Sequence, residues 1–121
     1  MTTSLFDRLG GAAGIDNIVD TAIAAHLANP IIKTRFLNAR DIDRAKRMAK
    51  EFFAHGASGG ALPYSGKDMV EAHKGMNISE QEYLAATDDI LEALAKHDIA
   101  EDARNDVLAI LYSLKGMIIR V

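Results

Sequence analysis

The stretch Met69-Val-Glu-Ala-His-Lys-Gly-Met-Asn-Ile78 places a histidine among soft apolar side chains. Its residues at i, i+3, i+4 and i+7, the spacing of one helical face, are Met69, Ala72, His73 and Met76. A buried imidazole needs a partner for at least one ring nitrogen: a carbonyl, a carboxylate or a metal. The chain has no cysteine, so an ordinary zinc cage of three or four ligands is not expected. One histidine is still enough as the axial ligand of a metal held by a macrocycle.

Length and composition indicate one globular domain over residues 1–121. The chain is 49% hydrophobic and 26% charged, which is ordinary for a folded domain. Its net charge of −3 leaves no basic surplus for non-specific nucleic-acid binding. Neither a signal peptide nor an apolar run of roughly 18 residues is visible, so we expect a cytoplasmic protein without membrane spans. We expect a monomer or a weak dimer.

Alanine and leucine are abundant and strand-like alternation is nearly absent, so the fold class is predicted to be all-α. The expected helical segments are a short one opening at 4–7, a long one over 12–28, a turn within 31–37, one from 38 or 41 to 57, the histidine stretch, one over 79–97, and a last one from 101 or 102. We expect Tyr83, Ala86, Ile90, Leu91 and Leu94 to face inward from the segment 79–97. A glycine-rich loop over 58–66 can hold the edge of a ligand or merely connect helices.

Other chemistries find little support. There is no Gly-x-Ser-x-Gly motif, and Gly59-Gly60 lacks the lysine that follows in a phosphate-binding loop. The pair Asp88-Asp89 is expected at the surface. His26, on an apolar face, fits either a satisfied core histidine or a polar group in a ligand pocket. A cofactor with a single protein ligand is favoured by elimination, although His73 satisfied by a backbone carbonyl stays open.

Several further segments, in this order and spacing, resemble one known family over nearly the whole chain. They are Ser4-Leu-Phe-Asp-Arg-Leu-Gly-Gly11, the turn with Phe36, Glu51-Phe-Phe53, Gly59-Gly60, Pro63-Tyr-Ser-Gly66 and Met69-Val-Glu-Ala-His-Lys-Gly75. Together they are similar to the truncated haemoglobins of group I. The resemblance implies a two-over-two helical sandwich around one haem b, with His73 as the proximal iron ligand.

The same resemblance implies which residues line the haem pocket. Phe36 would pack flat on the haem, beside Phe52, Phe53, Met69, Ala72, Met76, Ile78, Tyr83, Ala86 and Leu111. Cations or hydroxyls at the mouth would receive the propionates, with Lys46, Arg47, Tyr64 and Lys74 as candidates. Haem is large, flat and apolar, so a slot of such residues suits it.

The distal side departs from the family pattern. The family typically has a tyrosine on the second helix and often a glutamine on the helix of Phe52, both of which hydrogen-bond oxygen. The matching positions here are Ile23 and Ala49, with Ala45 as another pocket position. A one-residue shift of register would bring Arg44, Lys46 or Met48 into the pocket. The expected distal pocket is Ile23, His26, Ala45, Met48 and Ala49.

The expected function is binding of the diatomic gases O2, CO and NO in an unusually apolar pocket. One version adds nitric oxide dioxygenase activity with a reductase partner, and another adds ligand sensing. Oxygen transport is a family property that the missing tyrosine weakens. A six-coordinate haem protein for electron transfer or redox sensing, with His26, Lys46 or Met48 as sixth ligand, is an alternative. A haem-free four-helix structural domain is another.

Overall fold

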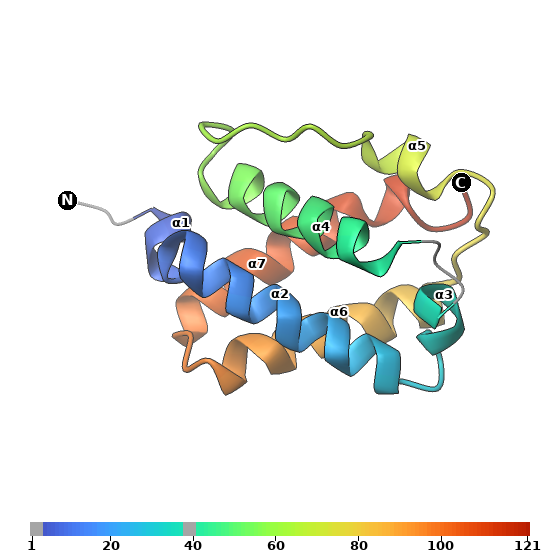
Figure 1. Cartoon of the computed structure of the whole chain (residues 1–121), viewed down its shortest axis with the longest axis horizontal. Coiled ribbons are helices and arrows are strands. Elements are labelled where there is room, and N and C mark those ends of the chain that lie inside the picture. The colour runs from blue at the N-terminus through green and yellow to red at the C-terminus, as the bar shows by residue number, and fades with distance from the viewer. Residues whose placement is uncertain (1–3, 38–40) are drawn as a thin grey trace.

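The computed structural model of the chain describes residues 4–37 and 41–121, which fold almost entirely into helices (Figure 1). Their bounds are α1 Leu5–Arg8, α2 Gly11–Ala28, α3 Lys33–Leu37, α4 Ile42–Ala57, α5 Met69–His73, α6 Glu80–Lys96, α7 Glu101–Leu114 and the 3-10 turn η1 Lys115–Met117. The all-α prediction is confirmed, since the described residues pair as extended chain only in one isolated bridge, Ile78 with Ile119. No helix of this part is long and apolar enough to cross a membrane.

Short polar side chains cap α1, α4, α5 and α6, and three of these helices begin where the sequence predicts. Each accepts a hydrogen bond from the backbone N–H three residues on and so satisfies one free donor of the first turn. The capping residues are Ser4 for α1, Asp41 for α4, Asp68 for α5 and Ser79 for α6. Ser79 and Glu82 form a capping box, in which each side chain accepts from the backbone N–H of the other residue. Asn38, the other candidate cap of α4, lies outside the described residues.

Helix α2 is the centre of the core. It packs against both α6 and α4, and α6 packs in turn against α7. Ile15 and Ile18 of α2 are almost completely buried, together with Leu9 and Leu94. In Figure 1, α2 and α4 form one helical pair, and α6 and α7 form the other. The predicted two-over-two sandwich is confirmed.

Glycine allows α1 and α2 to meet at a close corner. A Cβ atom on Gly14 would lie 2.1 Å from the carbonyl oxygen of Leu9, so no other residue fits there without moving the backbone. Gly10, the N-cap of α2, has φ +94°, which is the left-handed region that glycine adopts without strain. The pair Gly10-Gly11 therefore forms the corner between the first two helices.

The aromatic side chains lie outside the tightly packed core. All four phenylalanines are only half-buried: Phe6, Phe36, Phe52 and Phe53. Helix α4 is amphipathic, yet Ala57 is its only fully buried residue, and α5 has none. Phenylalanine is usually a core residue because burying its ring is strongly favourable. Apolar faces left half-covered indicate a space between the helices that a further apolar group would fill.

The prediction of one helical face through Met76 is wrong. Helix α5 ends at His73, because Lys74 is extended and Gly75 and Asn77 have φ values of +83° and +52°. Ala72 is exposed, so it does not share the half-buried environment of His73. Met76 reaches the cavity described below through a turn and not through helical periodicity.

Residues 118–121, which we call the C-terminal strap, hold the segment that follows His73. The backbone N–H of Arg120 donates to the carbonyl of Ile78 (2.9 Å), and that of Gly75 donates to Val121 (3.2 Å). The bridge between Ile78 and Ile119 lies between these two bonds. In Figure 1 the C-terminus accordingly lies beside α5. The strap fixes residues 75–78, and hence the exit of the chain from α5.

The inward face of α6 differs from the prediction. Of the five residues expected inside, only Leu94 is fully buried, and Tyr83, Ala86, Ile90 and Leu91 are half-buried. The buried residues of α6 are Ala85, Thr87, Asp89, Ala93 and Leu94. Helix α6 faces α2 on one side and α7 on another, so a single stripe does not describe its burial. The surface prediction for Asp89 is wrong, since the carboxyl is paired inside the protein.

Candidate functional site

A cavity of about 140 Å³ opens beside His73. Six of the residues predicted to line a cofactor pocket meet there: Phe36, His73, Met76, Ile78, Tyr83 and Ala86. They come from α3, from α5 and the turn that follows it, and from α6. The residues farthest apart in the sequence, Phe36 and Ala86, are separated by 50 positions. The fold therefore brings the aromatic turn and the histidine stretch to one place. Ile32, Arg35, Glu82 and Ile118 complete the lining and were not predicted.

The ring of His73 is oriented by its own helix. Its Nδ1 lies 2.9 Å from the carbonyl oxygen of Met69, one turn earlier. A carbonyl only accepts, so Nδ1 carries the proton and Nε2 presents a lone pair. The same arrangement orients metal-bound histidines generally, since the second nitrogen is fixed by a backbone or carboxylate acceptor. No group of three or more ligand-type side chains lies together in residues 4–37 and 41–121, so His73 is suited to a metal that brings its other ligands.

An ion pair forms one wall of this cavity. The guanidinium of Arg35 donates from Nε and a terminal nitrogen to the carboxylate of Glu82, at 2.6 and 3.0 Å. These bonds lower the pKa of Glu82 from 4.5 to about 2, against the opposing effect of desolvation, and Ser79 adds a backbone donor. The pair joins the turn of Phe36 to the first turn of α6. No local pattern could have revealed it, because its members lie 47 positions apart.

The hydroxyl of Tyr83 crosses from α6 to α7. It donates to the carbonyl oxygen of Leu111 at 2.5 Å, and burial raises the pKa of the phenol. Leu111, predicted to line the same pocket as Tyr83, lies instead in a second cavity of about 30 Å³ with Phe52 and Phe53. The structure thus divides the predicted lining residues between two hollows, one beside His73 and one among α1, α4 and α7.

The residues predicted for the mouth of the pocket have other partners in the structure. Lys46 lies 4.0 Å from Asp20, which has a closer partner in Lys50 at 3.1 Å. The hydroxyl of Tyr64 donates to the carbonyl of Lys67 at 2.6 Å. These bonds are exposed and carry little energy, so either side chain can exchange its partner for an anion.

Tyr64 also closes the glycine-rich loop over α4. Its ring packs edge-on against Phe52 with centroids 5.4 Å apart. Glu51 accepts from the backbone and the hydroxyl of Ser65, and these bonds lower the pKa of the carboxyl. Met69, another predicted lining residue, is half-buried at the start of α5. Arg47 and Lys74 are exposed.

The distal positions form an apolar seam between α2 and α4. Ile23 is buried in the core and Ala49 packs against that core, while Ala45 and Met48 are half-buried on α4. Aliphatic side chains supply no hydrogen-bond donor. The described residues of this seam are therefore apolar, but none of the four lines the cavity beside His73, so their place in a distal gas pocket stays a prediction.

His26 is a satisfied core histidine. Its Nδ1 lies 2.8 Å from a carboxylate oxygen of Asp89, and the amide of Asn29 donates to both oxygens at 3.2 and 3.3 Å. Its ring stacks on Phe36, with centroids 4.9 Å apart and planes inclined by 24°. His26 thus contacts an aromatic residue of the cavity. No short sequence pattern predicts the contact with Asp89, because the two residues lie 63 positions apart.

Taken together, the residues fit a flat apolar cofactor that brings its own metal. Phe36, Phe52 and Phe53 are half-covered, although their rings would be buried in an ordinary core. A single oriented imidazole faces a cavity lined largely by apolar side chains. Macrocyclic metal cofactors need this combination of one axial ligand and broad apolar contact.

Comparisons with known proteins point the same way. The family model of bacterial-like globins matches residues 4–120. The Group 1 truncated hemoglobin GlbN of Synechocystis sp. is 32% identical over 114 residues, covering 89% of both chains. The truncated hemoglobin of Tetrahymena pyriformis in its Fe(III) form superposes with a TM-score of 0.92 at 24% identity, covering 98% of this chain and 100% of the other. The 2/2 hemoglobin of Synechococcus sp., solved with covalently attached heme, has a TM-score of 0.82 at 26% identity and coverages of 93% and 94%.

Proposed function

Because this chain belongs to the bacterial-like globin family, a family of haem proteins that bind gaseous ligands, we propose that His73 holds haem b and that the protein responds to CO and NO more than it stores O2. The observation that carries the proposal is the orientation of His73 by Met69 beside a cavity lined by Phe36 and Met76.

Haem, when bound, would supply an iron able to bind a diatomic gas, and His73 would be the residue that holds it. His73 contributes the lone pair of Nε2, because its Nδ1 proton is held by the carbonyl of Met69. Phe36, Met76 and Ile78 offer apolar contact to the macrocycle beside that imidazole. Phe52 and Phe53 would extend this contact along α4.

The apolar seam of Ile23, Ala45 and Ala49 determines gas selectivity in this proposal. Dioxygen becomes partly anionic on binding, and one good donor is worth about 1.5–3 kcal/mol, or roughly ten- to a hundredfold in affinity. Aliphatic side chains withhold that energy, so dioxygen should dissociate quickly. Carbon monoxide and nitric oxide depend less on a donor and should be retained.

A sensing role is supported by the C-terminal strap. It ties residues 75–78, directly after His73, to the chain that leaves α7. A shift of His73 on gas binding would be transmitted through these backbone bonds to the end of α7. A nitric oxide dioxygenase role with a reductase would need long residence of dioxygen, which the apolar seam disfavours.

Of the three residues predicted as possible sixth iron ligands, two have other partners in the structure. His26 is committed to Asp89 and Phe36, and Lys46 lies near Asp20. Met48 is half-buried on α4 and forms no ion pair or hydrogen bond among the described residues. A resting sixth ligand from the protein would therefore be Met48 in this proposal.

Absorption spectra of the purified protein test the assignment of His73. We expect a Soret band in the wild type, and loss of haem to apomyoglobin at least tenfold faster in His73→Ala. The matched control is His55→Ala, since His55 also directs Nδ1 to a backbone carbonyl (Leu62, 2.7 Å) but lies outside the cavity. A colourless protein after expression with ample haem, or equal haem loss in both variants, would contradict the proposal.

A further inference from the structure

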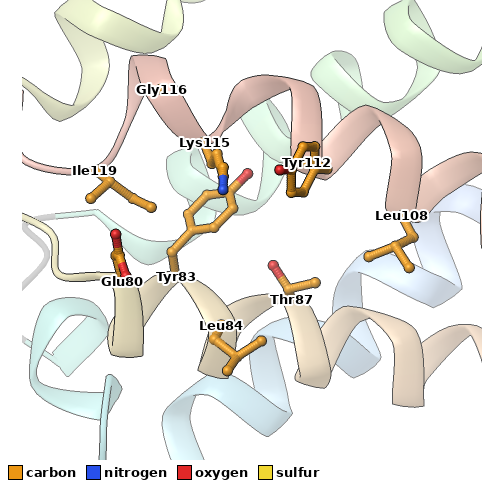
Figure 2. Close-up of a pocket in the computed structure, with 9 residues that line it drawn as sticks. All are labelled: Glu80, Tyr83, Leu84, Thr87, Leu108, Tyr112, Lys115, Gly116 and Ile119. Atoms are coloured by element: carbon orange, nitrogen blue, oxygen red, sulfur yellow. The ribbon is translucent and has the colours of Figure 1, made fainter.

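Another cavity lies next to the one beside His73 and shares only Tyr83 with it. It has a volume of about 480 Å³ and lies between α6 and α7 (Figure 2). Such a volume is in the usual range of small-molecule sites, about 300–1,000 Å³. Glu80 and Ile119 lie at one end and Leu108 at the other. Tyr83 is shared with the cavity of His73, and the remaining lining residues are Leu84, Thr87, Tyr112, Lys115 and Gly116.

The body of this cavity is apolar although it is open to solvent. Leu84 is 60% exposed and Tyr112 is 67% exposed, and Leu108 faces them from α7 at 40%. Large apolar side chains that gather around a hollow on a small protein mark a binding surface more often than scattered ones do. The two tyrosines present ring faces and edges, which suit a flat aromatic guest.

A hydroxyl of α6 also points into this space. Thr87 is only 8% exposed as a residue and lines the cavity. Figure 2 shows this hydroxyl directed toward the middle of the cavity. A hydroxyl both donates and accepts hydrogen bonds, so a guest with a polar atom can bond to it there.

The positive charge of Lys115 at the rim of the cavity favours a guest that carries an anionic group. The ammonium of Lys115 lies 4.3 Å from the ring centroid of Tyr112, and no carboxylate lies within 4 Å of it in the described part of the chain. Contact with an exposed ring leaves the three N–H donors of the ammonium free for an anion. Glu80, at the end beside Ile119, adds a negative charge that disfavours a doubly charged guest such as phosphate.

We infer that this cavity binds a small aromatic monocarboxylate, with the carboxylate at Lys115, a polar contact at Thr87 and the ring between Leu84 and Leu108. The hydroxyl of Tyr83 donates to Leu111, so its oxygen can only accept from the guest. The site is distinct from the haem site, and its test needs no change in haem.

Titration calorimetry of the haem-loaded protein with sodium benzoate tests the inference. We expect binding with a Kd on the order of 1 mM. Lys115→Met should weaken it about tenfold, because one charge-assisted hydrogen bond is lost. Lys96→Met is the matched control, since Lys96 is an exposed lysine of α6 whose partner is Glu92 and which lies outside the cavity. Thr87→Val, of similar shape, should weaken binding about threefold.

Neutral benzamide and the oligomeric state separate this inference from its rivals. Benzamide should bind at least fivefold more weakly than benzoate. Equal binding of the two compounds would overturn the assignment of an anion to Lys115. No heat with benzoate up to about 20 mM would overturn the site itself. A concentration-dependent dimer in sedimentation, abolished by Leu108→Lys, would instead show that this surface is an interface with a second copy of the chain.

Discussion

The buried link between His26 and Asp89 should be among the largest single contributions to stability outside the haem site. It joins α2 to α6, and the side chains of His26 and Asp89 are only 7% and 12% exposed. Removing one member of a buried pair typically costs about 3–5 kcal/mol, because the other is left without its partner. Asn29 still donates to Asp89 when His26 is absent. We therefore expect His26→Leu to cost about 3 kcal/mol, near the lower limit.

A double-mutant cycle separates the interaction from the loss of each side chain. Asp89→Leu leaves an imidazole without its acceptor and should cost about 2 kcal/mol. The double variant has neither polar group of the pair, so it should cost much less than the sum, with a coupling of about 2 kcal/mol. For a domain of 121 residues, His26→Leu should lower Tm by about 12 °C, at about 4 °C per kcal/mol.

Another histidine link between the same two helices provides the control. Thr21 and His97 also join α2 to α6, with the hydroxyl 2.7 Å from Nε2, but this bond is exposed. The cycle of Thr21→Val and His97→Leu should give a coupling below about 0.5 kcal/mol. Both cycles are measured by denaturant unfolding of the haem-loaded protein at one haem occupancy, followed by circular dichroism. Equal couplings in the two cycles would refute the reasoning.

Two further predictions concern the distal seam and the cavity wall. Ile23→Tyr should slow dioxygen dissociation ten- to a hundredfold by supplying a donor, and Ile23→Phe, of similar size without the hydroxyl, should not. Stopped-flow mixing checks both, and equal rates would place Ile23 outside the gas pocket. The folded pKa of Glu82 is about 2 against 4.5, so its ion pair with Arg35 stabilises the protein above pH 4.5 and is lost as pH falls toward 2. Glu82→Gln should cost about 1 kcal/mol at pH 7 and flatten acid unfolding, whereas Glu80→Gln should leave the acid limb unchanged.

Much of the fold could be predicted from the sequence, because its signals are local. Ser79 and Glu82 form a capping box that spacing alone reveals, and Gly10-Gly11 marks a corner that needs glycine. Helical periodicity failed where backbone conformation overrides it. The stretch around His73 has the apolar spacing of a longer helix, but Gly75 and Asn77 adopt positive φ and end it.

The candidate site could be predicted only in part, because many of its contacts join segments that are far apart in the sequence. Phe36 and His73 belong to short motifs that can be recognised in this sequence alone. The structure places both residues at one cavity. The ion pair of Arg35 with Glu82 and the hydrogen-bonded pair of His26 with Asp89 each join distant segments. The spacing of residues along the sequence carries no information on such pairs. The buried Asp89 was therefore predicted to lie at the surface. The separation of Leu111 from His73 likewise depends on how whole helices pack.

The C-terminal strap has a mechanical consequence for anyone who handles the protein. Force applied at Val121 is carried by its bond to Gly75 to a point two residues from the imidazole of His73. Pulling on an affinity tag or fluorescent fusion at that end would therefore load the backbone next to His73, the residue proposed to hold the haem. Immobilising the protein through its N-terminal end would avoid that load.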